Sequence, residues 1–491
     1  MNATSITSDS RRTGDCILFG IILLLGALGC VAQTPQPTPP GPAPSPSRPR
    51  LDPFPAEQDW SFLADQGEPT DSWDHLKYVR WGSSQQQYLS LGLETRTEYE
   101  YFGNWMLGAG PQDQNGYGLI RVMPHLDLHD GPDFRFFTEI TFNYAPGRSG
   151  GPRPNLDEDR GDFHQGFLEI GPHASRRDGS SLRLGRQEIV LGSGRLFDNN
   201  EGPNVKLSFD GVRIITETTK LCWDNFIAKP VQNNTGFFDD TPNHGQTTWG
   251  SYLTLHPQVL HSSGLDVYYL GLASANIAYN RGSANEVRHT LGVRTFREAQ
   301  AGVDYNWEWN YQLGSFGSEG LRAWSISTET GYTFAATRFT PRSLIRVDTY
   351  SGDHGSTGQS LGTYNSYFPR GAYFTPKAIP FLGNQNLIDI HPQVQFHLRA
   401  NVTGELGASW YWRESTADGV YAFGSGMLMD AASANHARFL GSQGDMELRW
   451  APAAHIVTAL NVAGFAPSGF LAGAENHRAP ITANLGMTYR F

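Results

Sequence analysis

Apolar and polar side chains alternate strictly along residues 88–102, which read YLSLGLETRTEYEYF. One set is apolar or hydroxylated, with aromatic residues towards one end: Leu89, Leu91, Leu93, Thr95, Thr97, Tyr99 and Tyr101. The other set is mostly charged: Ser90, Gly92, Glu94, Arg96, Glu98 and Glu100. A period of two over this length predicts a β-strand with one apolar face and one charged face.

The same alternation recurs in residues 134–144, 300–313 and 481–491, where aromatic and aliphatic side chains oppose charged and amide side chains. Less regular strand candidates lie at 118–128, 163–170, 207–217, 249–256, 265–273, 287–296, 322–334, 343–350, 386–398, 404–412 and 445–450. After Gly82 no segment of useful length has the 3.6-residue period of an amphipathic helix. The sequence therefore predicts an all-β protein.

The length of the predicted strands indicates where they lie. Strands in soluble proteins have about 5–6 residues, whereas a tilted strand that crosses a bilayer needs about 9–11. An apolar outer face bearing Trp and Tyr is typical of a wall that contacts lipid. At about 22 residues per strand, residues 88–491 predict a transmembrane antiparallel β-barrel of about 18 strands with an aqueous lumen. Four Gly-, Pro-, Asp- and Asn-rich segments are expected as long loops, some folded inward: 146–162, 233–247, 351–383 and 417–436.

Residues 182–214 carry an unusual density of charge for strand-like sequence, with a break at Gly192-Ser193-Gly194. The cations are Arg183, Arg186, Arg195, Lys206 and Arg213, and the acids are Glu188, Asp198, Glu201 and Asp210. Such charges favour strands with one face on water, and in a barrel that water fills the lumen. The glycines are expected where the backbone bends close to a neighbour.

The N-terminal part of the chain differs in composition from the rest. Residues 1–32 are predicted to be a signal peptide, with Arg11 and Arg12 before an apolar core; cleavage after Ala32 and lipidation at Cys30 both remain open. Residues 33–55 are predicted to be a Pro-rich disordered linker. Residues 56–87 are expected as a lead-in segment, periplasmic or plug-like. The barrel would then occupy residues 88–491.

The chain ends in MTYRF, an aromatic residue at the end of an alternating strand. This ending resembles the signal by which bacterial outer-membrane barrels are recognised for insertion. We therefore expect Phe491 to contact the insertion machinery, outer-membrane lipids to surround the barrel, and the protein to lie in the Gram-negative outer membrane.

Charge and cysteine content exclude several other classes. The formal net charge of -11 argues against a nucleic-acid partner. Of the 3 cysteines, two fall in the predicted signal peptide and Cys222 stands alone, so neither a disulfide scaffold nor a CxxC metal site is expected. No cofactor is expected.

Motifs for catalysis are weak. Residues 147–151 (GRSGG) match the GxSxG pattern of serine hydrolases, with Ser149 at the nucleophile position. A nucleophile elbow requires a helix after this motif, and no helix pattern follows it here. Asp157-Glu158-Asp159 with Asp162, and Asp239-Asp240, could bind calcium, although solvated acidic loops explain them more simply. We therefore predict that the protein is not an enzyme.

Several motifs resemble those of the alginate-export family of outer-membrane barrels: DWSFLAD (59–65), GRQE, GSGR, EGPNV and SFDGVR within 185–213, WGSY (249–252), TYNSYFPRGAYF (363–374) and YWRES (411–415). The resemblance spans roughly residues 59–491. It implies a monomeric barrel of about 18 strands that conducts an anionic polysaccharide through an arginine-rich constriction. Alginate itself does not follow from it.

The candidate substrate path is a set of charged residues expected to face the lumen: Arg96, Arg121, Arg135, Arg183, Arg186, Arg195, Lys206, Asp210, Arg213 and Arg346. The arginine fork pairs well with carboxylates, and several shallow sites would allow release. On the clean strands, however, acids outnumber bases, so a mutually paired ladder that stiffens the wall remains an alternative. We predict passive passage of an anionic polysaccharide or oligosaccharide; the alternatives are a general or sugar-selective porin and, less favoured, a barrel enzyme or surface-structural protein.

Overall fold

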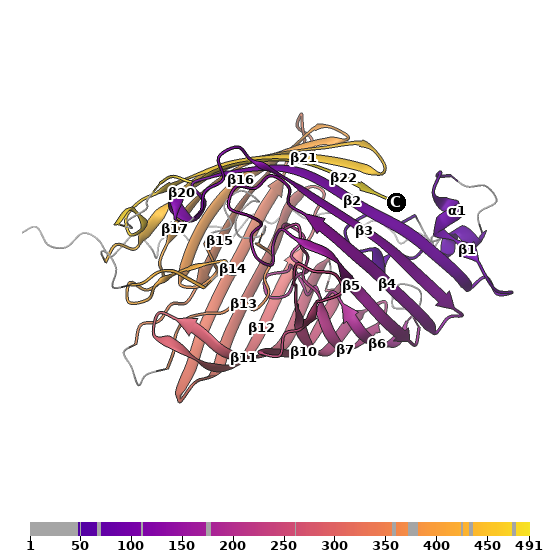
Figure 1. Cartoon of the computed structure of the whole chain (residues 1–491), viewed down its shortest axis with the longest axis horizontal. Helices are drawn as coiled ribbons and strands as arrows, with labels where there is room; N and C mark the ends of the chain where they lie inside the picture. The colour runs from indigo at the N-terminus through magenta and orange to yellow at the C-terminus, as the bar shows by residue number, and fades with distance from the viewer. Residues whose placement is uncertain are drawn as a thin grey trace, which may run out of the picture. The chain divides into compact units, whose positions relative to one another are not determined.

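The computed structural model describes residues 48–491 except 50, 66–69, 110, 173–177, 261, 356–359, 372–381, 424–425, 432–435 and 474–477. Its centre is a closed antiparallel barrel of 18 long strands, each paired with its neighbours along the chain (Figure 1). Closure is made by β2 and β22, which pair from Glu94↔Arg490 to Gly103↔Ile481. The predicted fold class and strand number are confirmed.

The barrel strands are β2 (Gln87–Gly103), β3 (Tyr117–Asp130), β4 (Phe134–Tyr144), β5 (Asp159–Ile170), β6 (Gly179–Gln187), β7 (Phe209–Glu217), β8 (Leu221–Gln232), β10 (Gln246–Leu260), β11 (Ser263–Tyr279), β12 (Gly282–Arg297), β13 (Gly302–Phe316), β14 (Glu319–Thr333), β15 (Arg342–Tyr350), β16 (Leu387–Arg399), β17 (Val402–Trp412), β20 (Phe439–Ala453), β21 (Ile456–Pro467) and β22 (Ile481–Arg490). Two short strands, β1 (Val79–Arg80) and β9 (Thr241–Pro242), extend the sheet at its rims.

The remaining elements are small: the hairpin β18 (Val420–Ala422) and β19 (Gly426–Met429), the helices α1 (Asp74–Lys77) and α2 (Trp105–Gly108), and the 3-10 turns η1 (Pro55–Glu57), η2 (Ser61–Asp65) and η3 (Leu471–Gly473). None of the helices in the described residues is long and apolar enough to cross a membrane.

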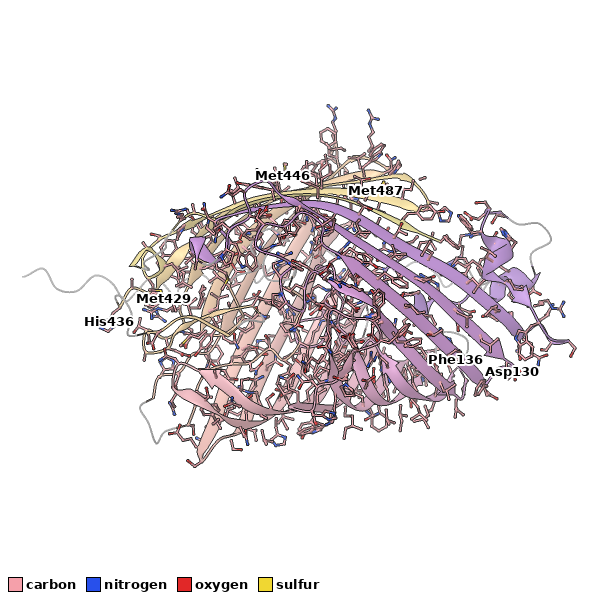
Figure 2. All side chains as sticks on the ribbon, viewed as in Figure 1. Asp130, Phe136, Met429, His436, Met446 and Met487 are labelled. Atoms are coloured by element: carbon pink, nitrogen blue, oxygen red, sulfur yellow. The ribbon has the colours of Figure 1, made fainter. Side chains whose placement is uncertain are left out.

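The two ends of the barrel differ. Most of the connections at one end are long, whereas those at the other are short turns such as residues 131–133, 218–220 and 400–401. Figure 2 shows Met429 and His436 at the first end, the loop end, and Asp130 and Phe136 at the second, the turn end. Because β2 begins and β22 ends at the turn end, the lead-in segment enters the barrel from there.

The alternation predicted from sequence matches the two faces of the wall. On β13, Val303, Trp309, Tyr311 and Leu313 are exposed on the outer face, while the polar side chains between them are buried on the inner face. Met446 and Met487 lie on the outer surface in Figure 2 and are likewise exposed. The apolar outer wall is what a strand in contact with lipid requires.

Two strands, β8 and β21, have no strong alternation and are absent from the candidates chosen by pattern. Their inner faces carry Phe226 and Ala228, and Ala463 and Phe465, which belong to an apolar cluster inside the barrel. The same cluster contains Leu196 and Phe197 from the β6–β7 connection, together with Leu382 and Phe470 from other connections. The loops that fold into the lumen thus pack apolar side chains against the inner faces of β8 and β21. Where they do so, both the inner and the outer face of these strands carry apolar side chains.

The lead-in segment also lies against the inner wall. Residues 51–58 contact side chains of β4, β6 and the β6–β7 connection. This differs from a disordered linker that reaches residue 55. The predicted signal peptide and most of the predicted linker lie outside the described residues.

Candidate functional site

The site is built around residues 188–208, the β6–β7 connection, which we call the inner loop. It turns back on itself at Gly192 and Gly194, whose φ angles of 55° and 78° favour glycine. A Cβ atom on Gly192 would lie 2.2 Å from the Tyr252 hydroxyl, so the backbone approaches β10 closely. The predicted bend is therefore present, but it leads into the lumen rather than directly into the next strand.

A second connection, residues 351–386, is joined to the inner loop by backbone hydrogen bonds. The Phe368 amide donates to the Leu196 carbonyl and the Asp198 amide to the Phe368 carbonyl, both at 2.9 Å. The Arg370 guanidinium pairs with the Asp198 carboxylate at 2.9 Å. The two loops therefore form one body inside the barrel.

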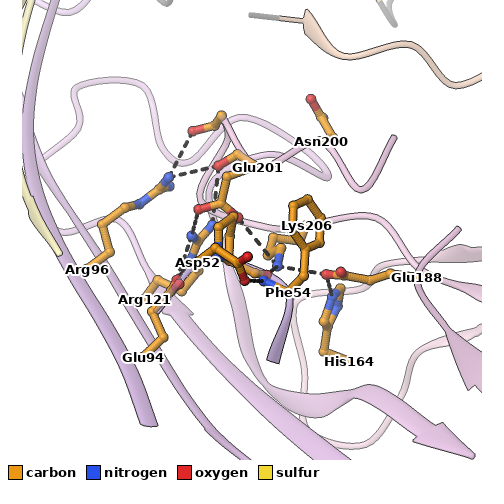
Figure 3. A network of polar contacts seen from close by, with 12 residues as sticks. Asp52, Phe54, Glu94, Arg96, Arg121, His164, Glu188, Asn200, Glu201 and Lys206 are labelled. Atoms are coloured by element: carbon orange, nitrogen blue, oxygen red, sulfur yellow. Dashed lines mark hydrogen bonds and ion pairs between the residues drawn. The ribbon is translucent and has the colours of Figure 1, made fainter. Parts of the chain in front are cut away.

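Below this body lies a network of paired charges, shown in Figure 3. Glu201 accepts from Arg121 at 2.5 Å and lies 3.4 Å from the Lys206 ammonium. Lys206 also pairs with Glu188 at 2.7 Å, and Arg121 with Glu94 at 2.6 Å. Arg121 and Lys206 thus each have two carboxylate partners.

Burial and partners act against each other on these groups. Burial lowers the pKa of Lys206, but Glu188 and Glu201 outweigh it, and the pKa lies above its ordinary value. Burial raises the pKa of Glu201, but Arg121 and Lys206 lower it below the ordinary value. Lys206 and Glu201 are therefore both charged around neutral pH.

Arg96 has mainly backbone partners. Its guanidinium donates to the carbonyls of Glu201 and Gly202 at 2.9 and 3.1 Å, and to that of Pro203 at 2.7 Å. A carboxylate, that of Glu98, lies 3.7 Å away. This arginine holds the end of the inner loop against β2.

Five other predicted lumen cations are also paired with acids, most of them on neighbouring strands. The pairs and their N–O distances are Arg135–Asp127 (2.6 Å), Arg183–Glu169 (3.0 Å), Arg195–Glu308 (3.0 Å), Arg213–Asp224 (2.5 Å) and Arg346–Glu329 (3.2 Å). These contacts form the ladder that the balance of acids and bases suggested.

Arg186 and Asp210 depart from the expected position in the lumen. They alternate with Arg183 and Arg213, and they share the face of Leu184, Val212 and Ile214, which are exposed on the outer wall. Their side chains pair in a two-bonded contact of 2.9 and 3.0 Å.

This outward pair borders a gap in the wall. Only residues 166–170 of β5 pair with β6, because the chain leaves the wall for the lumen after Gln187. Residues 233–240 cover the exposed edge: the Phe238 amide donates to the Gly161 carbonyl at 2.9 Å. Arg186 donates to the Phe163 and Asp240 carbonyls and so joins β5, β6, β7 and this loop.

A cavity of about 430 Å³ remains along the opposite wall, formed by β14–β17 and β20. Its cations are Arg346, Arg370 and Arg449, and its amides are Gln393 and Gln395. Its acids are Glu201, Glu329, Glu405, Asp445 and Glu447. Pro53 and Phe54 of the lead-in segment close one side. Of the predicted site residues only Arg346 borders this cavity.

Two acidic clusters have the spacing of metal ligands. In the first, Glu139, His164 and Glu188 place ligand atoms within 4.8 Å of one another, but the Lys206 ammonium already supplies a cation to Glu188. In the second, Asp162 accepts the backbone amides of Asp239 and Asp240 at 2.7 and 3.0 Å. Internal partners account for both clusters.

Four residues that border the cavity are not among those predicted from the sequence: Arg370, Arg449, Gln393 and Gln395. Arg370 lies in the TYNSYFPRGAYF segment, whose family resemblance could have directed attention to it. Arg449 and the two glutamines follow the inner parity of β20 and β16, but many other polar side chains do so as well. Parity alone therefore does not separate the cavity from the paired side of the lumen.

Comparisons with known proteins agree with this architecture. The family model described as alginate export matches residues 87–481. No curated protein matches the chain. Solved structures with the same fold include Pseudomonas aeruginosa OpdK with vanillate, at 11% identity and a TM-score of 0.53, covering 82% of this chain and 98% of that one.

Two further solved structures from the same organism are similar. OccK11 (OpdR) has 11% identity and a TM-score of 0.52, with 84% of this chain and 98% of that chain covered. OccK2 (OpdF) has 10% identity and a TM-score of 0.54, with coverages of 82% and 97%. At such low identity these structures establish the fold alone. The barrel is an outer-membrane channel of the Gram-negative type, and the chain belongs to the alginate export family.

Proposed function

We propose that this channel passes an anionic polysaccharide or oligosaccharide passively, along the cavity bordered by β14–β17 and β20. The observation that carries the proposal is that Arg346, Arg370 and Arg449 all border that cavity, as do Gln393 and Gln395. Guanidinium forks pair with carboxylates, and amides bond to hydroxyl groups. Uronate residues carry both groups, and membership of the alginate export family supports this substrate class.

The three arginines offer shallow rather than tight sites. Arg346 pairs with Glu329, Arg370 pairs with Asp198, and Arg449 lies 4.0 Å from Glu447. A passing carboxylate would therefore compete with an acid that is already present. Conduction requires this kind of weak, repeated binding, since a site that holds its ligand too tightly blocks the pore.

A sugar-selective porin for neutral solutes is the second candidate. It is favoured by the five carboxylates that border the same cavity, which would repel a polyanion. Neutral sugars could bond to the same acids and amides without this repulsion. The two candidates differ in whether a charged saccharide binds in the pore.

Single-channel recordings separate the two candidates. Alginate oligomers and neutral maltooligosaccharides of equal length are compared as blockers of the purified barrel. We expect alginate to block at lower concentration, and Arg449→Gln to raise its half-blocking concentration about fivefold, as loss of about 1 kcal/mol of screened attraction implies.

Lys229→Gln is the matched control, because Lys229 alternates with inward-facing residues on β8 and its removal changes the net charge equally. It should leave the block unchanged. Block by neutral sugars but not by alginate would contradict the anionic substrate and favour the porin.

A further inference from the structure

Residues 51–58, which join the predicted linker to the lead-in segment, lie on three cations inside the barrel. The Lys206 ammonium donates to the Pro53 carbonyl at 3.1 Å, and Arg135 donates to the Ala56 carbonyl at 2.7 Å. Arg183 donates to the Glu57 carboxylate at 3.1 Å. Successive acceptors along one stretch of chain thus meet Lys206, Arg135 and Arg183, which we call the cation track.

Apolar contacts support the same position. Ala56 packs against Phe137 and Phe167 in a small buried cluster. The guanidinium groups of Arg135 and Arg183 lie 5.7 and 4.3 Å from the centre of the Phe167 ring. The track therefore has an aromatic floor beside its cations, which suits a flat and polar chain as well as a peptide.

The wall is also arranged so that the segment can leave. Lys206 keeps Glu188, Arg135 keeps Asp127, and Arg183 keeps Glu169 when the lead-in contacts are removed. No cation of the track would be left buried without a carboxylate, and such a charge would be costly. The Glu57 side chain is 54% exposed, so its own release costs little desolvation.

The chain after residue 69 is held independently at the turn end. The Trp73 ring stacks on Phe491 with centroids 3.9 Å apart, and Asp71 pairs with His455 at 2.9 Å. These contacts would keep the lead-in segment tethered to the barrel after residues 51–58 withdraw.

We propose that residues 51–58 are a built-in occupant of a second saccharide-binding groove, made by the cation track and the Phe167 ring. When the segment withdraws, the groove binds a stretch of an anionic saccharide that presents carboxylates and hydroxyls where the segment presents its carbonyls and Glu57. Because Pro53 and Phe54 also border the open cavity, withdrawal widens the path. This inference rests on the proposed function for the identity of the ligand, but not for the presence of the occupant.

The test compares the full chain with a chain that lacks residues 51–58, in single-channel recordings with alginate oligomers as blocker. The deletion should raise the conductance and lower the half-blocking concentration of alginate several-fold. Adding the peptide LDPFPAEQ from the turn end should reverse both effects. Heat-modifiable mobility establishes that the shortened chain is folded.

A point variant avoids the deletion. Glu57→Arg places a cation beside Arg183 and should reproduce the deletion in part, with reversal by the same peptide. Glu447→Arg is the matched control, because it changes the lumen charge equally but lies on β20; it should alter alginate block without any response to the peptide.

The outcomes distinguish the two proposals. Equal conductance and equal block with and without residues 51–58 would overturn the occupant. A rise in conductance that the peptide reverses, with no block by alginate in any variant, would retain the occupant but reject the anionic ligand and with it the proposed function.

Discussion

The pair of Arg213 and Asp224 allows the strongest test of whether the lumen arginines stiffen the wall or bind a polymer. Arg213 donates two bonds of 2.9 Å and one of 2.5 Å to the Asp224 carboxylate. Its remaining terminal nitrogen donates to the Glu188 carbonyl at 3.3 Å. Both side chains are nearly buried, at 11% and 6% exposure. The geometry leaves little of the guanidinium for a ligand.

The expected magnitude follows from removing one partner at a time. Arg213→Leu leaves the Asp224 carboxylate buried without its cation, which costs about 3–5 kcal/mol of unfolding free energy. The double variant Arg213→Leu/Asp224→Leu removes both charges and should be close to the parent or more stable. The double-mutant cycle should therefore show a large favourable coupling between the two residues.

The assay is urea unfolding in detergent, followed by tryptophan fluorescence, with the anion-to-cation permeability ratio measured on the folded fraction. The single variant should unfold at lower urea concentration, the double variant near the parent, and neither should change the permeability ratio appreciably. An Arg213→Leu barrel of parental stability that has lost its anion permeability would instead identify Arg213 as part of the polymer path.

Three further variants test other parts of the structure. Burial lowers the pKa of Lys77 to about 7, against the opposing effect of Asp127. The unfolded chain then binds more protons than the folded one between about pH 7 and 10.5, so the unfolding free energy should rise with pH across that window, and Lys77→Met should abolish the rise in a pH series of urea midpoints. Phe197→Ala should lower the unfolding free energy by about 3–5 kcal/mol, because it removes packing from the inner loop, and should give a noisier, larger conductance. An unchanged current trace would contradict the expectation that the inner loop narrows the lumen. Arg186→Lys should lose the two-bonded contact to Asp210 and make residues 233–240 sensitive to protease, with no change in ion selectivity. Altered ion selectivity would indicate that Arg186 faces the lumen.

Much of the wall could be predicted because a lipid-facing strand must be apolar at every second position. On β2, β4, β13 and β22 this rule fixes both the strand and its faces. It fails on β8 and β21, since Phe226 and Ala463 face an apolar core that the inward loops supply. The pattern on a strand reports what its inner face touches, and that partner is distant in sequence.

The candidate site was harder to predict for the same reason. Arg195 meets Glu308, and Lys206 meets Pro53, across separations of 113 and 153 residues. Nothing local to these cations indicates their partners. Arg186 lies three residues after Arg183 on β6, so strict alternation places these two arginines on opposite faces, and Arg186 points outward.

While residues 51–58 occupy the cation track, we propose that solute moves along the wall of β14–β17 and β20 and not along the paired charges of β2–β6. Single cysteines test this directly in a Cys222→Ser background: Gln395→Cys borders the open cavity, and Gln165→Cys lies on the paired side, bonded to Glu139 at 3.0 Å. A negatively charged methanethiosulfonate reagent added to the open channel should lower the current promptly at position 395 and leave it unchanged at position 165. Rapid block at position 165 with none at position 395 would contradict a solute path along β14–β17 and β20.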